Sequence, residues 1–382
     1  MTPPPVRTAI VGCGMISSHY LTNCRQTDLL EVVACVDRDH GRAVEQAERF
    51  DIERACSLDA ALADSSIELV VNLTVPSEHG GVALAALRAG KSVYNEKPLA
   101  VSRELAAVLL QEAGGRGLHL GSAPDTFLGA GLQTCRALID SGEIGAPVAA
   151  MGFMLVRGPE LWHPDPAFLY QQGAGPLFDM GPYYITALVS LLGPVRRVTG
   201  SARTLHSERT VRSGPKQGEH FPVETPTHVA AVLEFSEGAV ASLVTSFDVS
   251  LSAGATFDLY GLGGGLLEIQ GVEGTISLPD PDTFGGPVRL RKLREAAWRD
   301  MPLSHGHAEE RRGIGIVDMA RAMRAGGAHR ANGELAYHVL DVMHCVLEAA
   351  RTGRHVTLGS SCDRPAPLDP DFRAFTSPDT AG

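Results

Sequence analysis

The chain has 382 residues, of which 44% are hydrophobic and 20% are charged, and its formal net charge is −11. A chain of this length is longer than the chains that usually fold around a single hydrophobic core, so we expect a globular protein of about two domains. The acidic balance argues against nucleic acid or an anionic membrane as a partner, and no apolar run reaches the roughly 18 residues that span a bilayer.

Two further features of composition concern the compartment. The first residues show no basic segment followed by an apolar one, so we expect a cytoplasmic protein without a secretory signal. The seven cysteines are scattered and form no closely spaced pair. That pattern favours reduced, mostly buried thiols over a disulfide framework, and it predicts no metal site.

The first third of the chain alternates between strand-like and helix-like segments. Short apolar runs predict buried strands at residues 7–11, 30–36, 67–73, 91–94 and 118–121. Helical patterns are found at residues 43–50, 57–63, 81–89 and 103–113. This alternation predicts a parallel sheet of about six strands with right-handed crossovers. We therefore assign residues 1–124 to an α/β dinucleotide-binding domain of the Rossmann type.

The turn after the first predicted strand is glycine-rich. Gly12 and Gly14 would let the backbone turn tightly and approach a pyrophosphate. Met15 and Ile16 follow at the start of a predicted helix, where free N–H groups bind phosphate. Ser17 replaces a third glycine at a position that mainly needs a small side chain. We predict that Gly12, Gly14, Met15 and Ile16 bind the cofactor.

The second predicted strand ends in an acid. Asp37 stands where dinucleotide-binding folds place the carboxylate that bonds the adenosine ribose hydroxyls. An aspartate there repels a 2′-phosphate, which favours NAD over NADP. The next residue, Arg38, can stack on adenine or accept a 2′-phosphate, so NADP stays open as an alternative.

The strand at 67–73 is followed by Thr74, Pro76 and His79. Ligands of open parallel sheets bind at the carboxyl ends of the strands. We therefore expect these three residues to face the cofactor.

The stretch at 92–99 places Glu96, Lys97 and Pro98 directly after a short apolar strand. The chain contains only four lysines against 29 arginines. A lysine in a dry pocket or beside another cation can release its proton near neutral pH, whereas an arginine cannot. Lys97 is therefore a candidate for chemistry.

Three motifs together, Gly12-Cys13-Gly14, Thr74-Val75-Pro76 with His79, and Glu96-Lys97-Pro98, resemble the glucose–fructose oxidoreductase / inositol dehydrogenase / rhizopine catabolism family, Gfo/Idh/MocA. The resemblance runs over almost the whole chain. It implies a second, C-terminal α+β domain whose large open mixed β-sheet supports the substrate and forms a homodimer or homotetramer. It also implies that Lys97 contacts the nicotinamide ribose and the reacting hydroxyl, while Glu96 lines the nicotinamide end of the cofactor site.

We assign the α+β domain to residues 125–358 and an extended or frayed tail to residues 359–382. Strand patterns are found at residues 148–156, 195–203, 229–235, 239–247, 255–261, 265–270 and 274–278. Helical patterns are found at residues 127–141, 313–323 and 333–350, and a further apolar helix ends at Gly193. Residues 204–225 form a long polar insertion whose composition is typical of mobile segments.

A second motif supports the resemblance with one departure. Asp179 is followed four residues later by Tyr183, where the family usually has a histidine as general base. A phenol can take that role if a nearby ammonium such as that of Lys97 lowers its pKa from about 10. Asp179 would hold the reacting hydroxyl or orient Lys97. Three alternatives for the base remain: Tyr184, His163, or Lys97 with Tyr183 orienting the substrate.

Other residues are candidates for substrate binding. The loop 157–172 lacks a regular period and carries Trp162 and His163, which would cover a polar ligand. Asp125 follows the last Rossmann strand, and Tyr184 neighbours the predicted base. His305 and His307 have no third ligand at a fitting spacing, so we predict no metal there.

These features predict an NAD(P)-dependent oxidoreductase that moves a hydride between nicotinamide and a secondary hydroxyl or ketone of a sugar, sugar derivative or cyclitol. Two alternatives remain. One is a glycoside-cleaving or epimerising enzyme whose bound NAD is transiently reduced. The other is an NAD(H)-binding regulatory protein without turnover.

Overall fold

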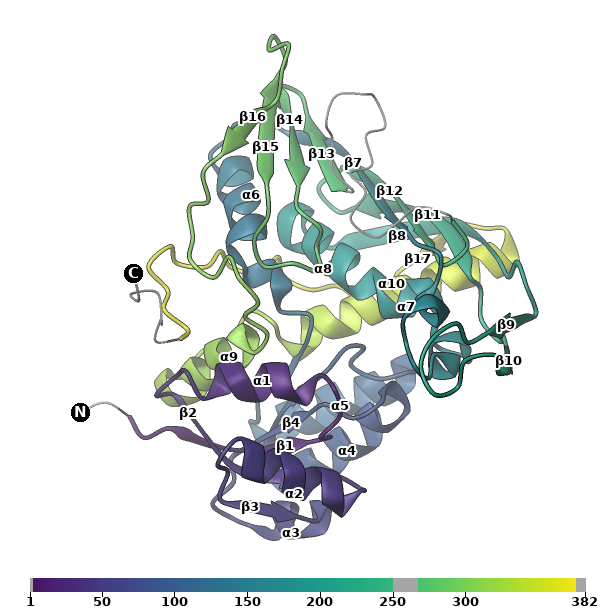
Figure 1. Ribbon diagram of the computed structural model, residues 1–382. Coiled ribbons are helices and arrows are strands. Elements are labelled where there is room, and N and C mark those ends of the chain that lie inside the picture. The colour runs from purple at the N-terminus through teal and green to yellow at the C-terminus, as the bar shows by residue number, and fades with distance from the viewer. Residues whose placement is uncertain (1–2, 250–266, 376–382) are drawn as a thin grey trace. The chain divides into compact units, whose positions relative to one another are not determined.

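The computed structural model describes residues 3–249 and 267–375 (Figure 1). The chain divides into two compact units. The first takes its described residues from Met1–Leu128, Glu309–Tyr337 and Leu368–Gly382, and the second from Gly129–Ala308 and His338–Pro367. The predicted strand at 255–261 and part of the one at 265–270 lie outside the described residues.

The first unit contains a six-stranded sheet in the order β3-β2-β1-β4-β5-β6, and every pair is parallel. Its strands are β1 (Val6–Val11), β2 (Leu30–Val36), β3 (Arg54–Cys56), β4 (Leu69–Asn72), β5 (Ser92–Asn95) and β6 (Leu120–Ser122). The helices between them are α1 (Ser17–Cys24), α2 (His40–Arg49), α3 (Leu58–Ala63), α4 (Pro76–Arg88) and α5 (Arg103–Arg116). The predicted Rossmann sheet is confirmed. The strand order reverses between β1 and β4, and such a switch point is where open α/β sheets bind ligands.

Helix α4 begins at Pro76 rather than at residue 81, where the helical pattern had been expected to start. Proline is well suited to the first helical position, because its missing N–H has no partner there and its φ is already helical. The turn after β4 is therefore short, and His79 lies on the helix.

The predicted division at residue 124 does not match the compact units. Helix α9 (Ile314–Ala325) belongs with the first unit, where Asp125 Oδ2 accepts the N–H groups of Gly313 and Gly315 at 2.8 and 2.9 Å. Arg324 pairs with both carboxylate oxygens of Glu68, at 2.7 and 2.6 Å. These contacts join segments far apart in the sequence, so composition alone could not place the boundary.

The described part of the tail, up to residue 375, has no helix or strand after β17 (Val356–Thr357), yet several of its side chains are buried. Leu368, Phe372 and Phe375 are buried. The guanidinium carbon of Arg321 lies 4.1 Å from the centre of the Phe372 ring. Three apolar side chains thus hold this segment against the first unit, although its Pro- and Asp-rich composition resembles that of a free terminus.

The second unit is built on a nine-stranded mixed sheet in the order β16-β15-β14-β13-β7-β12-β11-β8-β17. These strands are β7 (Pro147–Leu155), β8 (Val195–Arg203), β11 (His228–Phe235), β12 (Val240–Ser246), β13 (Leu267–Gly271), β14 (Gly274–Leu278), β15 (Val288–Lys292), β16 (Arg299–Met301) and β17 (Val356–Thr357). The predicted large mixed sheet is confirmed. Burial alternates strictly along β11, so one face of the sheet is packed.

Helices α6 (Ala130–Asp140), α7 (Gly175–Asp179) and α8 (Gly181–Leu192) lie on one face of this sheet (Figure 1). All residues of α8 are buried. The remaining regular structure in the described residues consists of three 3₁₀ turns, one long helix and one hairpin. The turns are η1 (Thr126–Leu128), η2 (Pro159–Leu161) and η3 (Ala167–Tyr170), and the helix is α10 (Gly333–Thr352). That hairpin, β9 (Glu208–Thr210) and β10 (His220–Pro222), orders the 204–225 insertion. The use of the sheet as an oligomer interface remains a prediction.

His338 in the second unit gives a prediction about stability. The ring is fully buried, and its Nε2 accepts the Val195 N–H at 3.0 Å. Burial lowers the pKa of His338 from 6.5 to about 4. Folding therefore favours the neutral ring. Its contribution to stability is complete at pH values above 6.5, the pKa of His338 in the unfolded chain, and it is lost as the pH falls toward 4. We expect the free energy of unfolding to fall by about 2 kcal/mol between about pH 7.5 and pH 5 through this residue.

Urea unfolding at both pH values, for wild type and His338→Gln, measures this effect. The variant should lose most of that pH dependence, whereas His355→Gln, which alters an exposed ring, should keep it. An identical pH dependence in wild type and His338→Gln would contradict the assignment.

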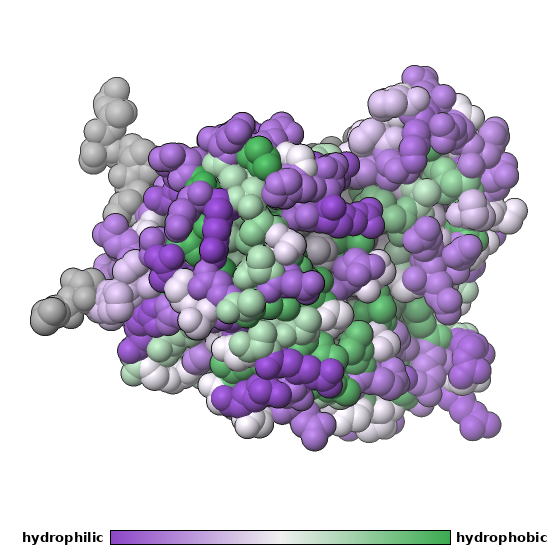
Figure 2. All heavy atoms as spheres, turned by 90° about the horizontal axis from the view of Figure 1, so that it is seen from below, coloured by the Kyte–Doolittle hydropathy of each residue, from purple (hydrophilic) through white to green (hydrophobic). Residues whose placement is uncertain are grey.

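The surface and the cysteines agree with the composition. Hydrophilic side chains alternate with smaller apolar patches on the face shown in Figure 2. Within residues 3–249 and 267–375, no helix is both long enough and apolar enough to cross a bilayer. All seven cysteines lie in these ranges, and six of them are buried, as the sequence predicted.

Candidate functional site

The glycine turn after β1 has the geometry of a phosphate cradle. Gly12 has a φ of +97°, and a Cβ there would lie 2.6 Å from the carbonyl carbon of Leu73, so only glycine fits. A Cβ on Gly14 would meet nothing within 4 Å, which leaves open space over the turn. Helix α1 has no acidic residue in its first turn, so its positive end is not neutralised. Met15 is exposed and Ile16 half-buried at this helix start.

The carboxylate of Asp37 lies against the same turn. Asp37 Oδ2 accepts the Cys13 N–H at 2.8 Å, and Oδ1 accepts the Asp39 N–H at 2.8 Å. The acid at the end of β2 therefore supports the glycine turn directly. Arg38 is exposed beside it. The ribose contact of Asp37 and the adenine contact of Arg38 remain predictions.

His79 joins the turn after β4 to the turn after β5. Its Nε2 lies 2.9 Å from the Thr74 carbonyl oxygen, and its Nδ1 lies 2.7 Å from that of Pro98. The ring is 1% exposed, and burial lowers its pKa. His79 can therefore act on a cofactor by fixing these two turns. Thr74 is half-buried, and Pro76 opens α4 beside it.

Two asparagines that sequence reasoning missed reinforce this connection. Asn72 Nδ2 donates to Asn95 Oδ1 at 3.0 Å, and Asn95 Nδ2 donates to the Leu99 carbonyl at 2.9 Å. Both residues are fully buried at the last positions of β4 and β5. Two neighbouring apolar strands each end in an asparagine, and this repetition in the sequence could have identified them.

The Glu96-Lys97-Pro98 turn follows β5 and includes a cis Lys97–Pro98 peptide bond. Glu96 Oε2 accepts the Lys97 N–H at 2.8 Å, and Glu96 Oε1 accepts the Tyr20 hydroxyl at 2.6 Å. Burial raises the pKa of Tyr20 well above its usual value, so its hydroxyl remains a donor. Lys97 itself is half-buried. Tyr20 was also missed, because nothing in the sequence links it to a residue 76 positions away.

We expect Tyr20→Phe to lower kcat about tenfold while leaving the NADH dissociation constant within about a factor of two. Without this donor, the Glu96 carboxylate keeps the Lys97 N–H but loses its second contact, so the loss should appear in kcat rather than in NADH binding. Tyr94→Phe is the matched control, because the Tyr94 hydroxyl is equally buried and has no hydrogen-bond partner among the described residues. A wild-type kcat in Tyr20→Phe would contradict this positioning role.

Asp125, a predicted substrate contact, is 1% exposed. Burial raises the pKa of its carboxyl to about 6, and Oδ2 already accepts two N–H groups at the start of α9. The structure thus gives Asp125 a role in capping a helix. A contact with substrate remains a prediction.

The predicted catalytic residues of the second unit lie at the junction of two helices. Asp179 ends α7 and is half-buried, while Tyr183 lies in the first turn of α8 and is 7% exposed. Tyr184 is 1% exposed, and its hydroxyl lies 3.4 Å from the Phe153 carbonyl oxygen, to which it donates. Burial raises the pKa of Tyr184 well above its usual value, which makes it a poor base. The assignment of the general base to Tyr183 remains a prediction.

Trp162 and His163 follow the 3₁₀ turn η2. Trp162 is 66% exposed, and its ring centre lies 5.4 Å from that of His163. His163 Nδ1 accepts the Asp165 N–H at 3.0 Å, so only Nε2 is left to meet a ligand. The role of both residues in substrate binding remains a prediction.

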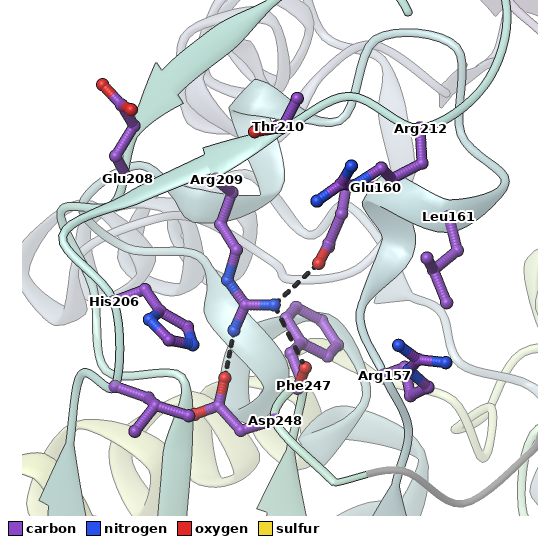
Figure 3. A pocket seen from close by; sticks show the side chains of 11 residues that line it. Arg157, Glu160, Leu161, His206, Glu208, Arg209, Thr210, Arg212, Phe247 and Asp248 are labelled. Atoms are coloured by element: carbon purple, nitrogen blue, oxygen red, sulfur yellow. Dashed lines mark hydrogen bonds and ion pairs between the residues drawn. The ribbon is translucent and has the colours of Figure 1, made fainter. Parts of the chain in front are cut away.

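A pocket of about 390 Å³ lies between the loop 157–172 and the β9–β10 hairpin (Figure 3). Its wall holds Arg209, whose guanidinium pairs with Glu160 Oε1 at 2.6 Å and with Asp248. The Tyr170 hydroxyl donates to Glu160 Oε2. We call this space the polar pocket. The sequence did not predict this network, although it identified the loop 157–172 as a candidate for substrate contact.

The candidate residues therefore form separate groups. The first unit brings together the glycine turn, Asp37, Thr74, His79, Glu96 and Lys97. The second brings together Asp179, Tyr183 and Tyr184 on adjoining helices. Among the described residues, no group of three or more His, Cys, Asp or Glu side chains could hold a metal ion.

Comparison with known proteins adds independent information. Residues 6–122 match the Gfo/Idh/MocA oxidoreductase family with an NAD-binding Rossmann fold, and residues 132–276 match the Gfo/Idh/MocA C-terminal domain. The chain is 27% identical over 282 residues to trans-1,2-dihydrobenzene-1,2-diol dehydrogenase of Bos taurus, covering 72% of this chain and 75% of that protein. It is 34% identical over 153 residues to inositol 2-dehydrogenase of Salmonella paratyphi B, covering 38% of this chain and 45% of that protein.

Among solved structures, levoglucosan dehydrogenase in complex with NADH and L-sorbose superposes with a TM-score of 0.78 at 21% identity. The match covers 93% of this chain and 99% of that one. At this identity the likeness establishes the fold alone.

Proposed function

Because the chain belongs to the Gfo/Idh/MocA family of NAD-binding oxidoreductases, we propose that it is a dehydrogenase or reductase acting on a secondary hydroxyl or ketone of a sugar, sugar derivative or cyclitol. The observation that carries the proposal is the Glu96-Lys97-Pro98 turn, which presents a half-buried lysine at the carboxyl end of β5. The named relatives support the substrate class, since a dihydrobenzenediol and inositol both carry secondary hydroxyls on a ring.

The residues of the first unit fit a dinucleotide. The open space over Gly14 and the free positive end of α1 would receive the pyrophosphate, and Asp37 would bond the adenosine ribose. Asp37 also makes NAD the expected cofactor rather than NADP, because its charge opposes a 2′-phosphate. When bound, the nicotinamide supplies the hydride acceptor or donor.

The proton chemistry falls to the protein. The Lys97 ammonium would stabilise the alkoxide that develops as hydride leaves the carbinol carbon. Tyr183 takes the hydroxyl proton during oxidation and returns it during reduction. Asp179 orients the reacting hydroxyl or Lys97. A general base placed in this way contributes about 10²- to 10⁴-fold to the rate.

Turnover with a panel of sugars and cyclitols tests the proposal. Purified protein is incubated with NAD and each compound, and both nicotinamide absorbance and product are followed. NADH formed in step with a ketone product is the expected result. Product without net NADH would instead identify the glycoside-cleaving or epimerising alternative, and NAD(H) binding without turnover across the panel would identify a regulatory protein.

A further inference from the structure

The polar pocket has acids that already have partners within the protein. Glu160 accepts from Arg209 and Tyr170, and Asp248 pairs with Arg209 and accepts the Thr227 hydroxyl at 2.6 Å. The third acid, Glu208, lies 3.0 Å from His220 Nδ1. Each of the three acids in this wall is therefore paired with another side chain of the protein, so none of them is available to bind a ligand.

Two arginines of the same pocket, unlike its acids, lack partners within the protein. Arg157 and Arg212 have no side-chain hydrogen bond or ion pair with any residue in the described ranges. Both belong to the pocket lining, and Figure 3 shows their guanidinium groups around the same space as Arg209. Two guanidinium groups from different segments are thus free to meet a ligand here, as is the ring of His206, which also lines the pocket and has no hydrogen bond or ion pair within the described ranges.

The backbone under these two arginines is fixed. The Arg212 N–H donates to the Glu160 carbonyl at 2.8 Å. Arg157 precedes Gly158, which has a φ of +99° and packs so closely on Glu160 and Tyr170 that a Cβ would lie 2.3 Å from Glu160 Oε2. The side chains of Glu160, Arg209 and Asp248 are only 7%, 10% and 8% exposed. Both free arginines therefore extend from a backbone that neighbouring buried residues hold in place, which fixes where their side chains begin.

We propose that the polar pocket binds the carboxylate of a sugar acid, with Arg157 and Arg212 pairing with its oxygens. Guanidinium and carboxylate are matched in shape and charge and form paired hydrogen bonds. A volume of about 390 Å³ lies within the usual range for small-ligand sites. The sugar part of this assignment rests on the proposed function.

Isothermal titration calorimetry with gluconate and glucuronate tests the proposal on the full chain, with glucitol and glucose as uncharged counterparts. The sugar acids should bind the wild type, and binding should weaken as salt rises. Arg157→Gln and Arg212→Gln should each weaken acid binding about tenfold, and the double variant about 50-fold or more. Arg294→Gln, an exposed arginine outside the pocket, should leave binding unchanged.

Equal binding of acids and neutral sugars, or acid binding unchanged in the double variant, would overturn the proposal. Inorganic phosphate is titrated in parallel, and phosphate binding tighter than that of both sugar acids would overturn the carboxylate assignment. NADH binding and turnover are measured on the same variants. Turnover of neutral sugars without binding of the sugar acids would contradict only this inference. Binding of the sugar acids with no redox turnover would contradict only the proposed function.

Discussion

Replacing Lys97 by methionine is expected to lower kcat about 1,000-fold while the dissociation constant of NADH stays within about a factor of three. Methionine keeps an unbranched stem but removes the ammonium that would stabilise the developing alkoxide. The backbone of the turn should persist, because Glu96 is held by Tyr20 and accepts the Lys97 N–H rather than its side chain.

The control for this experiment is Lys292→Met, since the Lys292 side chain is 43% exposed and pairs with Glu143 in the second unit. Steady-state kinetics and NADH binding are measured for both variants with whichever compound the substrate panel identifies. Substantial turnover in Lys97→Met would remove Lys97 from the chemistry. A loss of NADH binding together with the loss of kcat would instead show that Lys97 mainly binds the cofactor.

Tyr183→Phe is expected to lower kcat about 100-fold or more, because the variant lacks the group that takes the proton. Tyr184→Phe should retain most activity, since the Tyr184 hydroxyl donates to a backbone carbonyl and burial raises its pKa. Comparing the kcat of these neighbours at several pH values separates a base from a packing residue. A normal rate in Tyr183→Phe would move the role to His163 or to Lys97, and His163→Gln then decides between them.

Much of the first unit could be predicted from the sequence because its signals are local. An apolar run such as 30–36 can form a buried strand whatever surrounds it, and it is found as β2 over the same residues. The glycine turn also depends on neighbouring positions, since Gly12 needs its positive φ wherever that turn forms. Local patterns likewise indicated the strand at 274–278 and the helix that ends at Gly193.

The features that the sequence could not reveal depend on contacts between distant segments. Tyr20 meets Glu96 across 76 positions, and Asp125 meets Gly313 across 188. The polar pocket depends on Arg209 reaching Glu160, 49 positions away, and no periodicity encodes that pairing. Pairing of this kind also explains why a polar insertion expected to resemble a mobile segment forms an ordered hairpin.

The central claim is that the first unit binds a nicotinamide dinucleotide through the glycine turn and Asp37. Its most direct test is a fluorescence titration of the purified protein with NADH and, separately, NADPH, repeated with Asp37→Ala. We expect tighter binding of NADH by wild type and a loss of about tenfold or more in NADH affinity in the variant, with a smaller loss for NADPH. Failure of either dinucleotide to bind, with none released on denaturation, would contradict the account.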